Sequence, residues 1–494
     1  MSNDVTEPIQ YSLGQPPQRT GLGGFSMKAT LIVATGFFTF LVLQLVGLAK
    51  LGFTVVLPAT ALAAVLVSVR WATRTVAEMG QIVWQDRTRR RHREDEYLSG
   101  PSSRVPGGRR RLPGLLARTE SMSGTDSDGQ PFVAIIDRPR REATVLLDCQ
   151  LTGQTAMTQE ERNGQTAEWS RWLAMLSLSG DVESAVIVVG TRPGTGQLVS
   201  KEVSSIVVPE APPVAHTIMG EMAETLSIGV PEIQAHVAIT VKFDGEVMAD
   251  GSFMGQLATR LPGWYSSLSW AGILAEPMDE DAAVARIHGF FNPAAEVDFE
   301  ELSIDGEPHL LPWDEAGPSS ALTARDAYHH DGVTSVTWEM REAPRSTFED
   351  MLLRTLIAPH PRIARKRVAL VYRPYEAGAG ASRVEDEHRD AMVAANSSKK
   401  VTSAKAEMRL EHTEAARRAQ ARGAQLGRYS LFVTATVDDA GQLQRVRHDI
   451  EQLGAGASIR LAPMTRQQDT GFQITCGAGQ VPWGKESTSS MASA

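Results

Sequence analysis

One long apolar run constrains this chain more than any other feature. It covers residues 29–71 and reads ATLIVATGFFTFLVLQLVGLAKLGFTVVLPATALAAVLVSVRW. A helix rises about 1.5 Å per residue, so about 20 apolar residues cross the hydrocarbon layer of a bilayer. Residues 29–49 supply one span and residues 52–69 a second. A lysine at the bilayer centre costs roughly 3 kcal/mol on insertion scales, so we expect the chain to turn at Lys50-Leu51-Gly52.

A cleaved signal peptide or a buried core hairpin would also contain an apolar run, but both fit this one less well. A signal peptide has a short apolar core close to the N-terminus, whereas 28 mostly polar residues come first here and a second span follows at once. Small residues in the second span would let two membrane helices approach closely; they are Ala59, Thr60, Ala63 and Ala64. The run therefore predicts a transmembrane helical hairpin.

Basic residues on both flanks predict its orientation. Arg19 and Lys28 precede the hairpin, and RTRRRHR (87–93) and SRVPGGRRR (103–111) follow it, whereas the turn offers only Lys50. Because positive residues stay on the cytoplasmic side, we expect a multi-pass protein of the inner (cytoplasmic) membrane with both termini in the cytoplasm.

The charge is divided unequally along the chain. Residues 1–119 hold 15 Lys and Arg against 7 Asp and Glu, a net charge of +8, and the whole chain carries −9, which leaves −17 for residues 120–494. An acidic body is a poor ligand for nucleic acid, so no direct nucleic-acid contact is expected. The basic belt beside a membrane span favours anionic lipid headgroups over DNA. The predicted lipid-contact residues are Arg87, Arg89, Arg90, Arg91, Arg93, Arg109, Arg110 and Arg111.

The rest of the chain predicts an α+β fold, with two or more cytoplasmic strand–helix sandwich domains behind the hairpin. The expected divisions are an N-terminal tail (1–28), two transmembrane helices (29–70), a basic juxtamembrane segment and linker (71–130), a first α+β domain (131–245), a second α+β region (246–480) and a disordered tail (481–494). The two cysteines, Cys149 and Cys476, end apolar strand-like stretches and are expected to be buried thiols.

Apolar patterning predicts the individual elements. Alternating or continuous apolar runs predict strands at PFVAIID, ATVLLDC, VESAVIVVGT, AHVAITVKF, SVTWEMRE, RKRVALVYRPY and RYSLFVTATV. Helical spacing predicts helices over 158–178, 279–293, 346–359 and 399–427, the second with Asp279 as its N-cap. Residues 197–209 are expected to be extended, and residues 99–130 and 294–330 to be loops.

No motif in the sequence supports catalysis, and no cofactor or metal is expected. Gly479 to Lys485 has the spacing of a phosphate-binding loop, but Glu486 replaces the required hydroxyl and no helix follows. GTRPGTGQ (190–197) lacks the GxGxxG order and is more typical of a hairpin loop. His329 and His330 are adjacent, and neighbouring side chains seldom share one ion. Glu385-Asp386-Glu387-His388 is expected to be a solvated charge run.

The closing third resembles a known protein family. IARKRVALVYRPY, a long charged helix ending ARGAQLGRYSLFVTATV, and GASIRLAPMTRQQDTGFQITCGAG are similar to the N-terminal, non-ATPase domain of the traffic ATPases of type IV secretion and conjugation systems. The hairpin resembles the two-span inner-membrane subunit that some systems fuse to this ATPase. GLLARTESMSGTDSDGQPFVAIID and WSRWLAMLS resemble actinobacterial membrane proteins found with conjugation-type ATPases.

The resemblance implies a non-enzymatic membrane scaffold. The ATPases continue into a nucleotide-binding domain where this sequence ends, so a separate motor ATPase and membrane lipids are the expected partners, within an oligomeric assembly. The transported cargo would be DNA or protein. Two alternatives stay open: a membrane component of a type VII secretion system, and a membrane-tethered nucleotide hydrolase that uses the GQVPWGKE loop.

Overall fold

A computed structural model describes residues 9, 11, 27–71, 74–100, 103, 112–151, 153, 157–208, 210–225, 229–344, 347–397, 404–421 and 423–482. The chain divides into two compact units. One contains residues 14–95 and 485–494, and the other contains residues 1–13 and 96–484. The first is called the helical unit below and the second the body.

The helical unit begins with two apolar helices joined by a tight turn. Its elements are α1 (Met27–Leu45), α2 (Ala49–Leu51), the π-helical turn η2 (Gly52–Val56) and α3 (Leu57–Ser68). The turn is centred on Gly47, whose φ of +82° a side chain would disfavour. The predicted turn at Lys50-Leu51-Gly52 is therefore wrong by about one helical turn, because the glycine that can adopt a left-handed conformation lies earlier.

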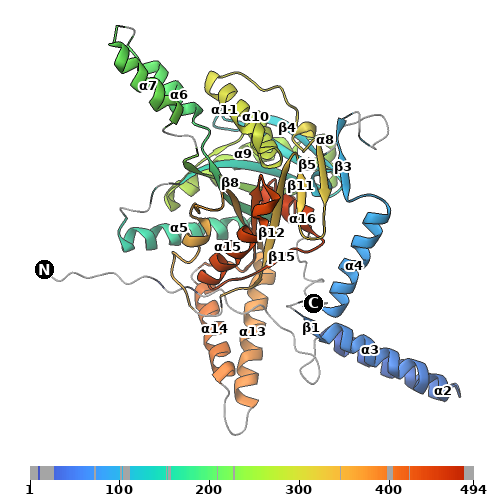
Figure 1. Ribbon diagram of the computed structural model, residues 1–494. Helices are drawn as coiled ribbons and strands as arrows, with labels where there is room; N and C mark the ends of the chain where they lie inside the picture. The colour runs from blue at the N-terminus through green and yellow to red at the C-terminus, as the bar shows by residue number, and fades with distance from the viewer. Residues whose placement is uncertain are drawn as a thin grey trace. The chain divides into compact units, whose positions relative to one another are not determined.

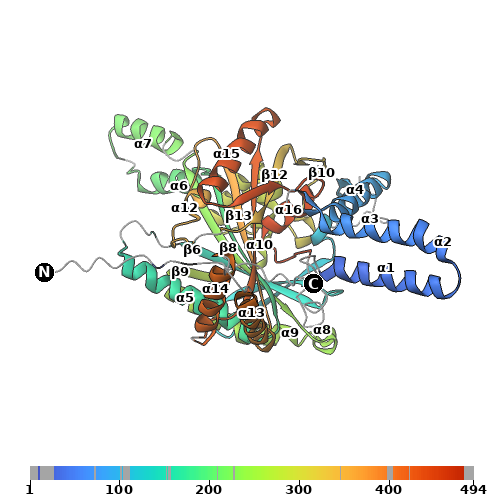
Figure 2. The same ribbon diagram turned by 90° about the horizontal axis from the view of Figure 1, so that it is seen from below.

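The two helices run antiparallel and side by side (Figure 2). A Cβ built on Gly36 of α1 would lie 1.9 Å from Cγ2 of Thr60 on α3, so a glycine is needed where the helices approach most closely. Phe40 and Phe53 pack edge to face with ring centroids 4.9 Å apart. Thr60, one of the small residues predicted to allow close approach, does lie at this contact.

A third helix follows after a short reversal of the chain. The two-residue strands β1 (Arg70–Trp71) and β2 (Arg74–Thr75) pair and lead into α4 (Val76–Arg91). Thr75 and Glu78 form a reciprocal capping box, in which the Thr75 hydroxyl accepts from the Glu78 amide and the Glu78 carboxylate accepts from the Thr75 amide. This cap explains why α4 begins at residue 76.

The body is built on one sheet. Among the described residues, thirteen strands form a single antiparallel sheet in which two similar modules can be distinguished (Figure 1). The first module contains, in chain order, β6 (Glu142–Leu151), α5 (Gln159–Leu178), β7 (Val182–Pro193), β8 (Pro231–Lys242), α9 (Phe253–Leu268) and β9 (Ile273–Pro277). Its strands lie in the order β9-β6-β8-β7, which is the split β-α-β arrangement of ferredoxin-like domains.

The second module repeats this topology. It contains β12 (Val333–Glu342), the short α12 (Arg354–Ile357), β13 (Arg365–Pro374), β14 (Gly427–Val437), α15 (Leu443–Gly456) and β15 (Arg460–Pro463), with strand order β15-β12-β14-β13. The modules join where β7 pairs antiparallel with β13, each the second strand of its own module. An antiparallel pairing of equivalent strands relates the two modules by an approximate two-fold axis.

Further strands extend the sheet at both ends. β5 (Pro131–Asp137) pairs with β6 and with β4 (Thr119–Thr125), and on the other side β11 (Tyr328–His330) pairs with β12 and with β10 (Ser320–Thr323), which pairs with β3 (Glu96–Leu98). The 3₁₀ turns are η4 (Gly114–Leu116), η5 (Ser269–Ala271), η6 (Pro293–Ala295), η7 (Trp313–Glu315) and η8 (Ala440–Gln442). The predicted loop at 99–130 is wrong over β4, and the predicted loop at 294–330 is wrong over β10, β11 and the helix α11 (Glu296–Asp305).

Helices cover both faces of the sheet. On one face α5 and α9 enclose a core around Trp172, and α12 and α15 enclose a second core around Trp338. On the opposite face α10 (Glu280–Phe291) and α16 (Gln468–Cys476) pack on the sheet strands. Each of these two helices follows the fourth strand of its module. Asp279 caps α10 as predicted, since its carboxylate accepts a hydrogen bond from the Ala282 amide at 2.8 Å.

Each module carries a helical insertion between its second and third strands. The first module carries the short helix pair α6 (Gln197–Ile206) and α7 (Pro213–Thr225), and the second carries α13 (Ala377–Ser397) and α14 (Ala404–Ala421) (Figure 1). The extended segment predicted over 197–209 is therefore wrong over α6, and the single helix predicted over 399–427 is the second arm of a pair. α8 (Gly245–Asp250) completes the helices described.

The predicted helix, strand and domain limits differ from this arrangement in four places. Of the helix predicted over 346–359, only α12 is α-helical among the described residues. FQITC, predicted as a strand, lies in α16. The boundary predicted at residue 245 falls inside the first module, between β8 and α9, and both α+β regions lie in one compact unit. Val481, assigned to the disordered tail, is buried in the core.

Candidate membrane-contact site

The apolar helices of the helical unit expose the side chains that a soluble protein would bury. Within the described residues, Ala49–Ser68 is the one helix long and apolar enough to span a bilayer, with a mean hydropathy of 2.1. α1 is apolar over Ala29–Leu45 and is shorter. Leu45 is 88 % exposed and Phe38 68 % exposed. An exposed apolar surface of this extent indicates contact with lipid or with another protein.

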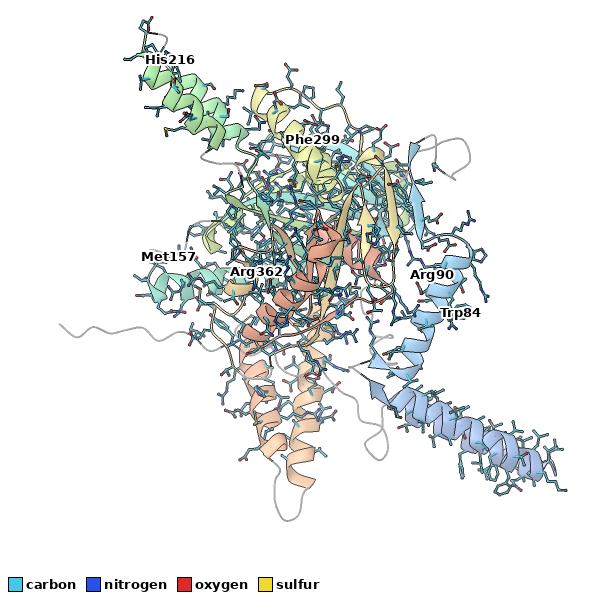
Figure 3. The ribbon with its side chains drawn as sticks, viewed as in Figure 1. Trp84, Arg90, Met157, His216, Phe299 and Arg362 are labelled. Atoms are coloured by element: carbon cyan, nitrogen blue, oxygen red, sulfur yellow. The ribbon has the colours of Figure 1, made fainter. Side chains whose placement is uncertain are left out.

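α4 continues this surface with a stripe of its own. Met79, Gly80, Val83, Trp84 and Arg87 lie 3, 4, 7, 8 and 11 residues after Val76, so all six share one face of the helix. Trp84 is 68 % exposed. Figure 3 shows Trp84 and Arg90 extending from the helix. Residues three or four apart share a helix face, so the stripe is apolar near α3 and becomes basic one turn later.

The predicted lipid-contact arginines divide into two groups. Arg87, Arg89, Arg90 and Arg91 lie on the last turns of α4, and Arg93 follows in a turn with φ of +55°. Of these, Arg89 is half-buried and the others are exposed. Arg90 also donates to the buried Asp86 carboxylate at 3.1 Å. The remaining predicted residues, Arg109, Arg110 and Arg111, lie outside the described residues. The structure does not test lipid contact, so that role stays a prediction.

The apolar half of this site was not predicted from the sequence. The signal was present as the spacing of Val76, Met79, Val83 and Trp84, which indicates an amphipathic helix. This spacing was overlooked because the run of arginines immediately after it suggested an irregular basic linker. The combination of aromatic and aliphatic side chains with a basic end is typical of helices that lie at a membrane surface.

The loop that resembled a phosphate-binding motif has a structural role at its described end. Gly479 has φ of +82°, and a Cβ there would lie 2.3 Å from Cγ2 of Thr144. The Gly479 carbonyl accepts a hydrogen bond from the Thr240 hydroxyl at 3.2 Å. Gln480 and Val481 are buried. The first glycine of the motif is therefore used for close packing on β6 and β8. Gly484, Lys485 and Glu486 lie outside the described residues.

The glycine-rich loop and the adjacent histidines also have identifiable structural contacts. The loop after β7 leads into α6, with Gly196 as the N-cap at φ of +83°, and not into a second strand. His330 is buried with its ring nitrogens 2.5 Å from the Phe291 carbonyl and 2.8 Å from the Ser335 hydroxyl, and His329 contacts Thr334. Within the described part of the chain, no three His, Cys, Asp or Glu side chains are grouped to hold a metal ion.

Two residues of the acidic run predicted to be solvated, Glu385 and Asp386, are exposed, and the run also connects two helices. Glu385 on α13 accepts a hydrogen bond from Arg417 on α14 at 3.0 Å, and His388 contacts the Thr413 hydroxyl at 3.2 Å. Glu387 is partly buried, and this burial raises the pKa of its carboxyl. The charges therefore help to hold the helical pair together.

Both cysteines are free and buried, as predicted. Burial raises the pKa of the Cys149 thiol and of the Cys476 thiol to about 12. A thiol with a raised pKa is a poor nucleophile at neutral pH because little thiolate is present. Cys476 ends a helix and not the predicted strand.

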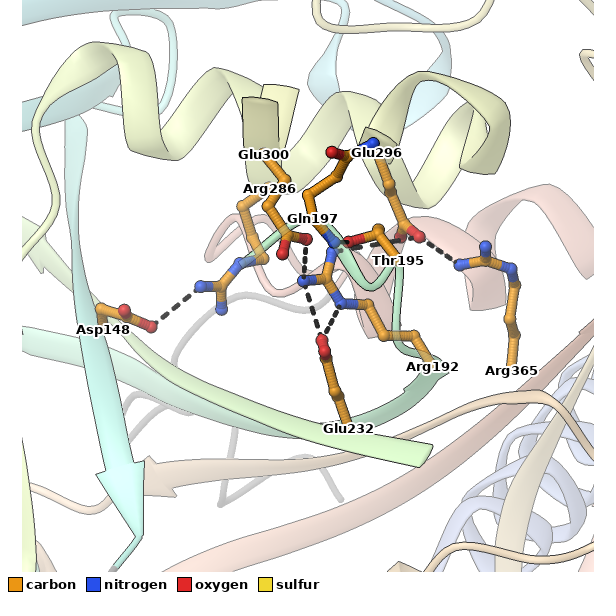
Figure 4. Close-up of polar contacts among 9 residues, drawn as sticks. All are labelled: Asp148, Arg192, Thr195, Gln197, Glu232, Arg286, Glu296, Glu300 and Arg365. Carbon is orange, nitrogen blue, oxygen red and sulfur yellow. Dashed lines mark hydrogen bonds and ion pairs between the residues drawn. The ribbon is translucent and has the colours of Figure 1, made fainter. Parts of the chain in front are cut away.

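A charged layer that was not predicted from the sequence lies between the sheet and α10–α11 (Figure 4). Arg192 on β7 contacts Glu232 at 3.1 Å and Glu300 at 3.2 Å. Arg365 on β13 contacts Glu296 at 2.5 Å, which fixes the start of α11 against the second module. These residues are distant in sequence, so spacing alone offered no signal for them.

Comparison with known proteins adds no family assignment. No protein-family model matches the chain. A search of curated proteins found no match either.

Proposed function

We propose that this protein is a non-enzymatic scaffold of the cytoplasmic membrane, a subunit of a conjugation or type IV secretion-like apparatus that docks a separate motor ATPase. The observation that carries the proposal is the exposed apolar surface of α1 and Ala49–Ser68 in the same compact unit as α4. In this proposal the two apolar helices cross the membrane as a hairpin, and α4 lies at the cytoplasmic surface.

The chemistry of α4 supports this arrangement. Val76, Met79, Val83 and Trp84 are suited to the acyl boundary, and Arg87, Arg90 and Arg91 to anionic headgroups. Each basic residue near an anionic surface contributes about 1 kcal/mol of attraction. α4 begins eight residues after α3 ends, which keeps its apolar stripe close in sequence to the proposed membrane exit.

The body supports the scaffold role by its construction. Two α+β modules share one sheet, and each carries a helical insertion. The similarity of the C-terminal third to the non-ATPase domain of traffic ATPases is the basis for proposing a motor ATPase as partner and for the assignment to a transfer apparatus. In this proposal the body remains in the cytoplasm and assembles with further copies.

The membrane part of the proposal is tested with reporter fusions to the full chain. Alkaline phosphatase inserted at Gly47 is expected to be active outside the cytoplasm, and a fluorescent protein fused at the C-terminus is expected to fluoresce inside. Replacing the exposed Phe38 and Leu62 by arginine should release the protein from membranes, whereas arginine at the exposed surface position Trp270 of the body should not. Phosphatase activity at the C-terminus, or a wild-type chain that remains soluble without detergent, would refute the topology.

The partner proposal needs a separate experiment. The detergent-solubilised chain, co-expressed with a motor ATPase of a conjugation or type IV secretion system, is expected to purify with that ATPase. A variant with Arg87, Arg90 and Arg91 changed to glutamine should still bind the ATPase but bind vesicles of anionic lipid more weakly. Purification of the chain alone under gentle conditions would contradict the docking role and leave the membrane topology untouched.

A further inference from the structure

The helical insertion of the first module has an exposed apolar face. α6 and α7 form a short antiparallel pair, called the arm below, that projects from the rest of the body (Figure 1). Several of its large apolar side chains are exposed: Leu198, Val199, Ile206, Val208, Val214, Ile218 and Met222. A contiguous apolar surface of this kind on a soluble domain marks a site of interaction.

Helical spacing gathers these side chains into two stripes. Val214, Ile218 and Met222 recur every four residues along α7, and Val199 and Ile206 lie two turns apart on α6. On each helix the stripe precedes, in the same rotational sense, the half-buried side that packs on the other helix. Because the helices run antiparallel, the two stripes lie on the same side of the arm and form one face.

The base of the arm is fixed to the body. Gly194 donates a backbone hydrogen bond to the Val230 carbonyl at 2.7 Å and accepts one from the Gly229 amide at 3.1 Å, which continues the β7–β8 ladder into the arm. Lys201 of α6 forms an ion pair with Asp305 of α11. The apolar face is therefore presented by a preformed element, so a ligand that binds it has little ordering cost to overcome.

The equivalent insertion of the second module differs in character. α13 and α14 are held together by charged contacts such as that between Glu385 and Arg417. Among the described residues of this longer pair, the exposed large apolar side chains are Met392, Val393 and Met408. An apolar outer face is thus a property of the first insertion and does not follow from its place in the module.

The arm is acidic. Residues 197–225 contain one lysine and four glutamates, a net charge of −3. The lysine, Lys201, is engaged by Asp305 at the base. Glu202 is exposed beside the stripe of α6, and Glu221 is exposed beside the stripe of α7. Negative charge therefore borders the apolar face on both helices.

This charge distinguishes between the classes of ligand that an apolar face can bind. Helices that lie on a membrane surface carry lysine and arginine on their polar side, and the anionic cytoplasmic leaflet repels an acidic element. Docking of the same face of a second copy would bring two acidic borders together, and juxtaposed like charges weaken binding. A helix with an apolar stripe between basic residues complements both the face and its borders.

We infer that the arm docks a basic amphipathic helix of a partner protein. Apolar side chains of that helix would pack on Val214, Ile218 and Met222, and its lysines or arginines would lie beside Glu202 and Glu221. The arm belongs to the body, so this docking does not depend on the membrane contact of the helical unit. It adds a protein-binding surface to the proposed scaffold, and its failure would leave the membrane topology unaffected.

The test uses a fluorescent label on the arm of the full chain in an uncharged detergent. Both native cysteines are buried, so Ser205→Cys can carry an environment-sensitive dye alone. The probe is a synthetic helical peptide of leucine and lysine with the leucines on one face, and its control is the same peptide with glutamate in place of lysine. We expect a saturable response to the lysine peptide that weakens with salt, and none to the glutamate peptide. Equal responses to both peptides, or none to the lysine peptide, would overturn the inference.

Variants locate the binding. Ile218→Asn removes the centre of the α7 stripe and should lower the affinity for the lysine peptide about 10–100-fold. Thr217→Asn, at the neighbouring exposed position off the stripe, is the matched control and should bind as the wild type does. Glu202→Lys should weaken binding and reduce its salt dependence. A dye placed at Trp270→Cys, elsewhere on the body, should not respond. Wild-type affinity in a folded Ile218→Asn would refute the assignment.

Two further measurements identify the other possible occupants. The mass of the full chain is determined by light scattering, and a smaller oligomer in Ile218→Asn than in the wild type would assign the face to a second copy. Vesicles of uncharged phosphatidylcholine are added to the labelled chain without peptide, and a blue shift of the dye would assign the face to lipid. Either result would overturn the proposed partner helix, whereas an unchanged mass and an unshifted dye support it.

Discussion

Acidification should destabilise the body through two buried histidines on the face of the sheet covered by α10 and α16. His236 on β8 is 1 % exposed and its Nε2 lies 3.1 Å from the Cys476 carbonyl. His330 on β11 is 2 % exposed and contacts Phe291 and Ser335. Burial lowers the pKa of each imidazole to about 3. Nearby Arg286 and Arg367 lower the pKa of His236 further, and Arg367 and His329 lower that of His330. The backbone carbonyls that the two histidines contact raise both pKa values.

The sign of the effect follows from linkage. An unfolded histidine has a pKa near 6.5, so below that pH the unfolded chain binds protons that the folded chain excludes. Above pH 6.5 the histidine is neutral in both states, so it does not change the free energy of unfolding. As the pH falls from 6.5 towards 3, only the unfolded state is protonated and the free energy of unfolding decreases. One pKa unit corresponds to about 1.36 kcal/mol, so each histidine costs about 2 kcal/mol at pH 5, and the two together cost about 4 kcal/mol.

One carboxyl works in the opposite direction. Burial raises the pKa of Glu142 to about 7, while Arg140 and Lys242 lower it and Glu183 and Asp137 raise it further. Its folded state binds a proton that the unfolded state releases above pH 4.5. Acidification from pH 7.5 to 5 therefore raises the free energy of unfolding by roughly 2 kcal/mol through this carboxyl. The pKa of Lys366 is lowered to about 8, so this lysine is largely protonated in both states below that pH and changes the free energy of unfolding little between pH 7.5 and 5. The wild-type chain should lose about 2 kcal/mol net.

The histidine contribution is measured as a difference between variants. Urea unfolding of the detergent-solubilised full chain, followed by tryptophan fluorescence, gives the free energy of unfolding at pH 7.5 and pH 5. His330→Asn keeps a polar side chain that cannot titrate, so it should lose about 2 kcal/mol less than the wild type between these pH values. His448→Asn, at an exposed position of α15, is the matched control. An unchanged pH dependence in both His330→Asn and His236→Gln would refute the reasoning.

Three further predictions concern packing and capping. Asp279→Ala should cost about 1 kcal/mol in the free energy of unfolding through loss of the α10 cap, and Asp279→Ser should recover most of it. Phe291→Ala should cost about 3–5 kcal/mol in the same urea assay because the ring is fully buried, whereas Trp270→Ala, at a side chain 75 % exposed, should be nearly neutral. Gly36→Leu should separate α1 from α3, since even a Cβ would lie 1.9 Å from Thr60; faster proteolysis of the hairpin in detergent would show it, and unchanged proteolysis would contradict the packing.

The strands of the body were the most predictable elements from sequence. β5, β6, β7, β8, β12, β13 and β14 all coincide with apolar runs that were predicted as strands. Their side chains either alternate between faces or are buried on both, so the pattern reflects the sheet directly. Asp279 was also predictable as a cap, because an N-cap depends on its own first turn and on little else. The helical spacing over 158–178 also predicted Trp169 and Trp172 as core residues; Trp172 is buried and Trp169 is partly buried against the same core.

Elements whose environment is set by distant residues were not predictable. α16 is buried over most of its surface, including its polar residues Gln468, Asp469 and Gln473, so it has no exposed polar face to mark it as an amphipathic helix and FQITC resembles a strand. α13 was missed because charged residues that pair across to α14 suggest a solvated run when only one of the two helices is considered. The order of strands across the β7–β13 seam depends on pairing between residues about 180 positions apart, which a single sequence does not reveal.

The candidate sites divide along the same line. The arginines of α4 were identifiable because their role depends on local sequence beside an apolar run. The cluster around Arg367 was not, because it requires β7 and β13 to pair and α10 and α16 to return to the same face of the sheet. Neither module alone could build it: the second module supplies the guanidinium, and the helix that follows each module supplies one aromatic ring. A cluster assembled in this way exists only when the two halves have docked.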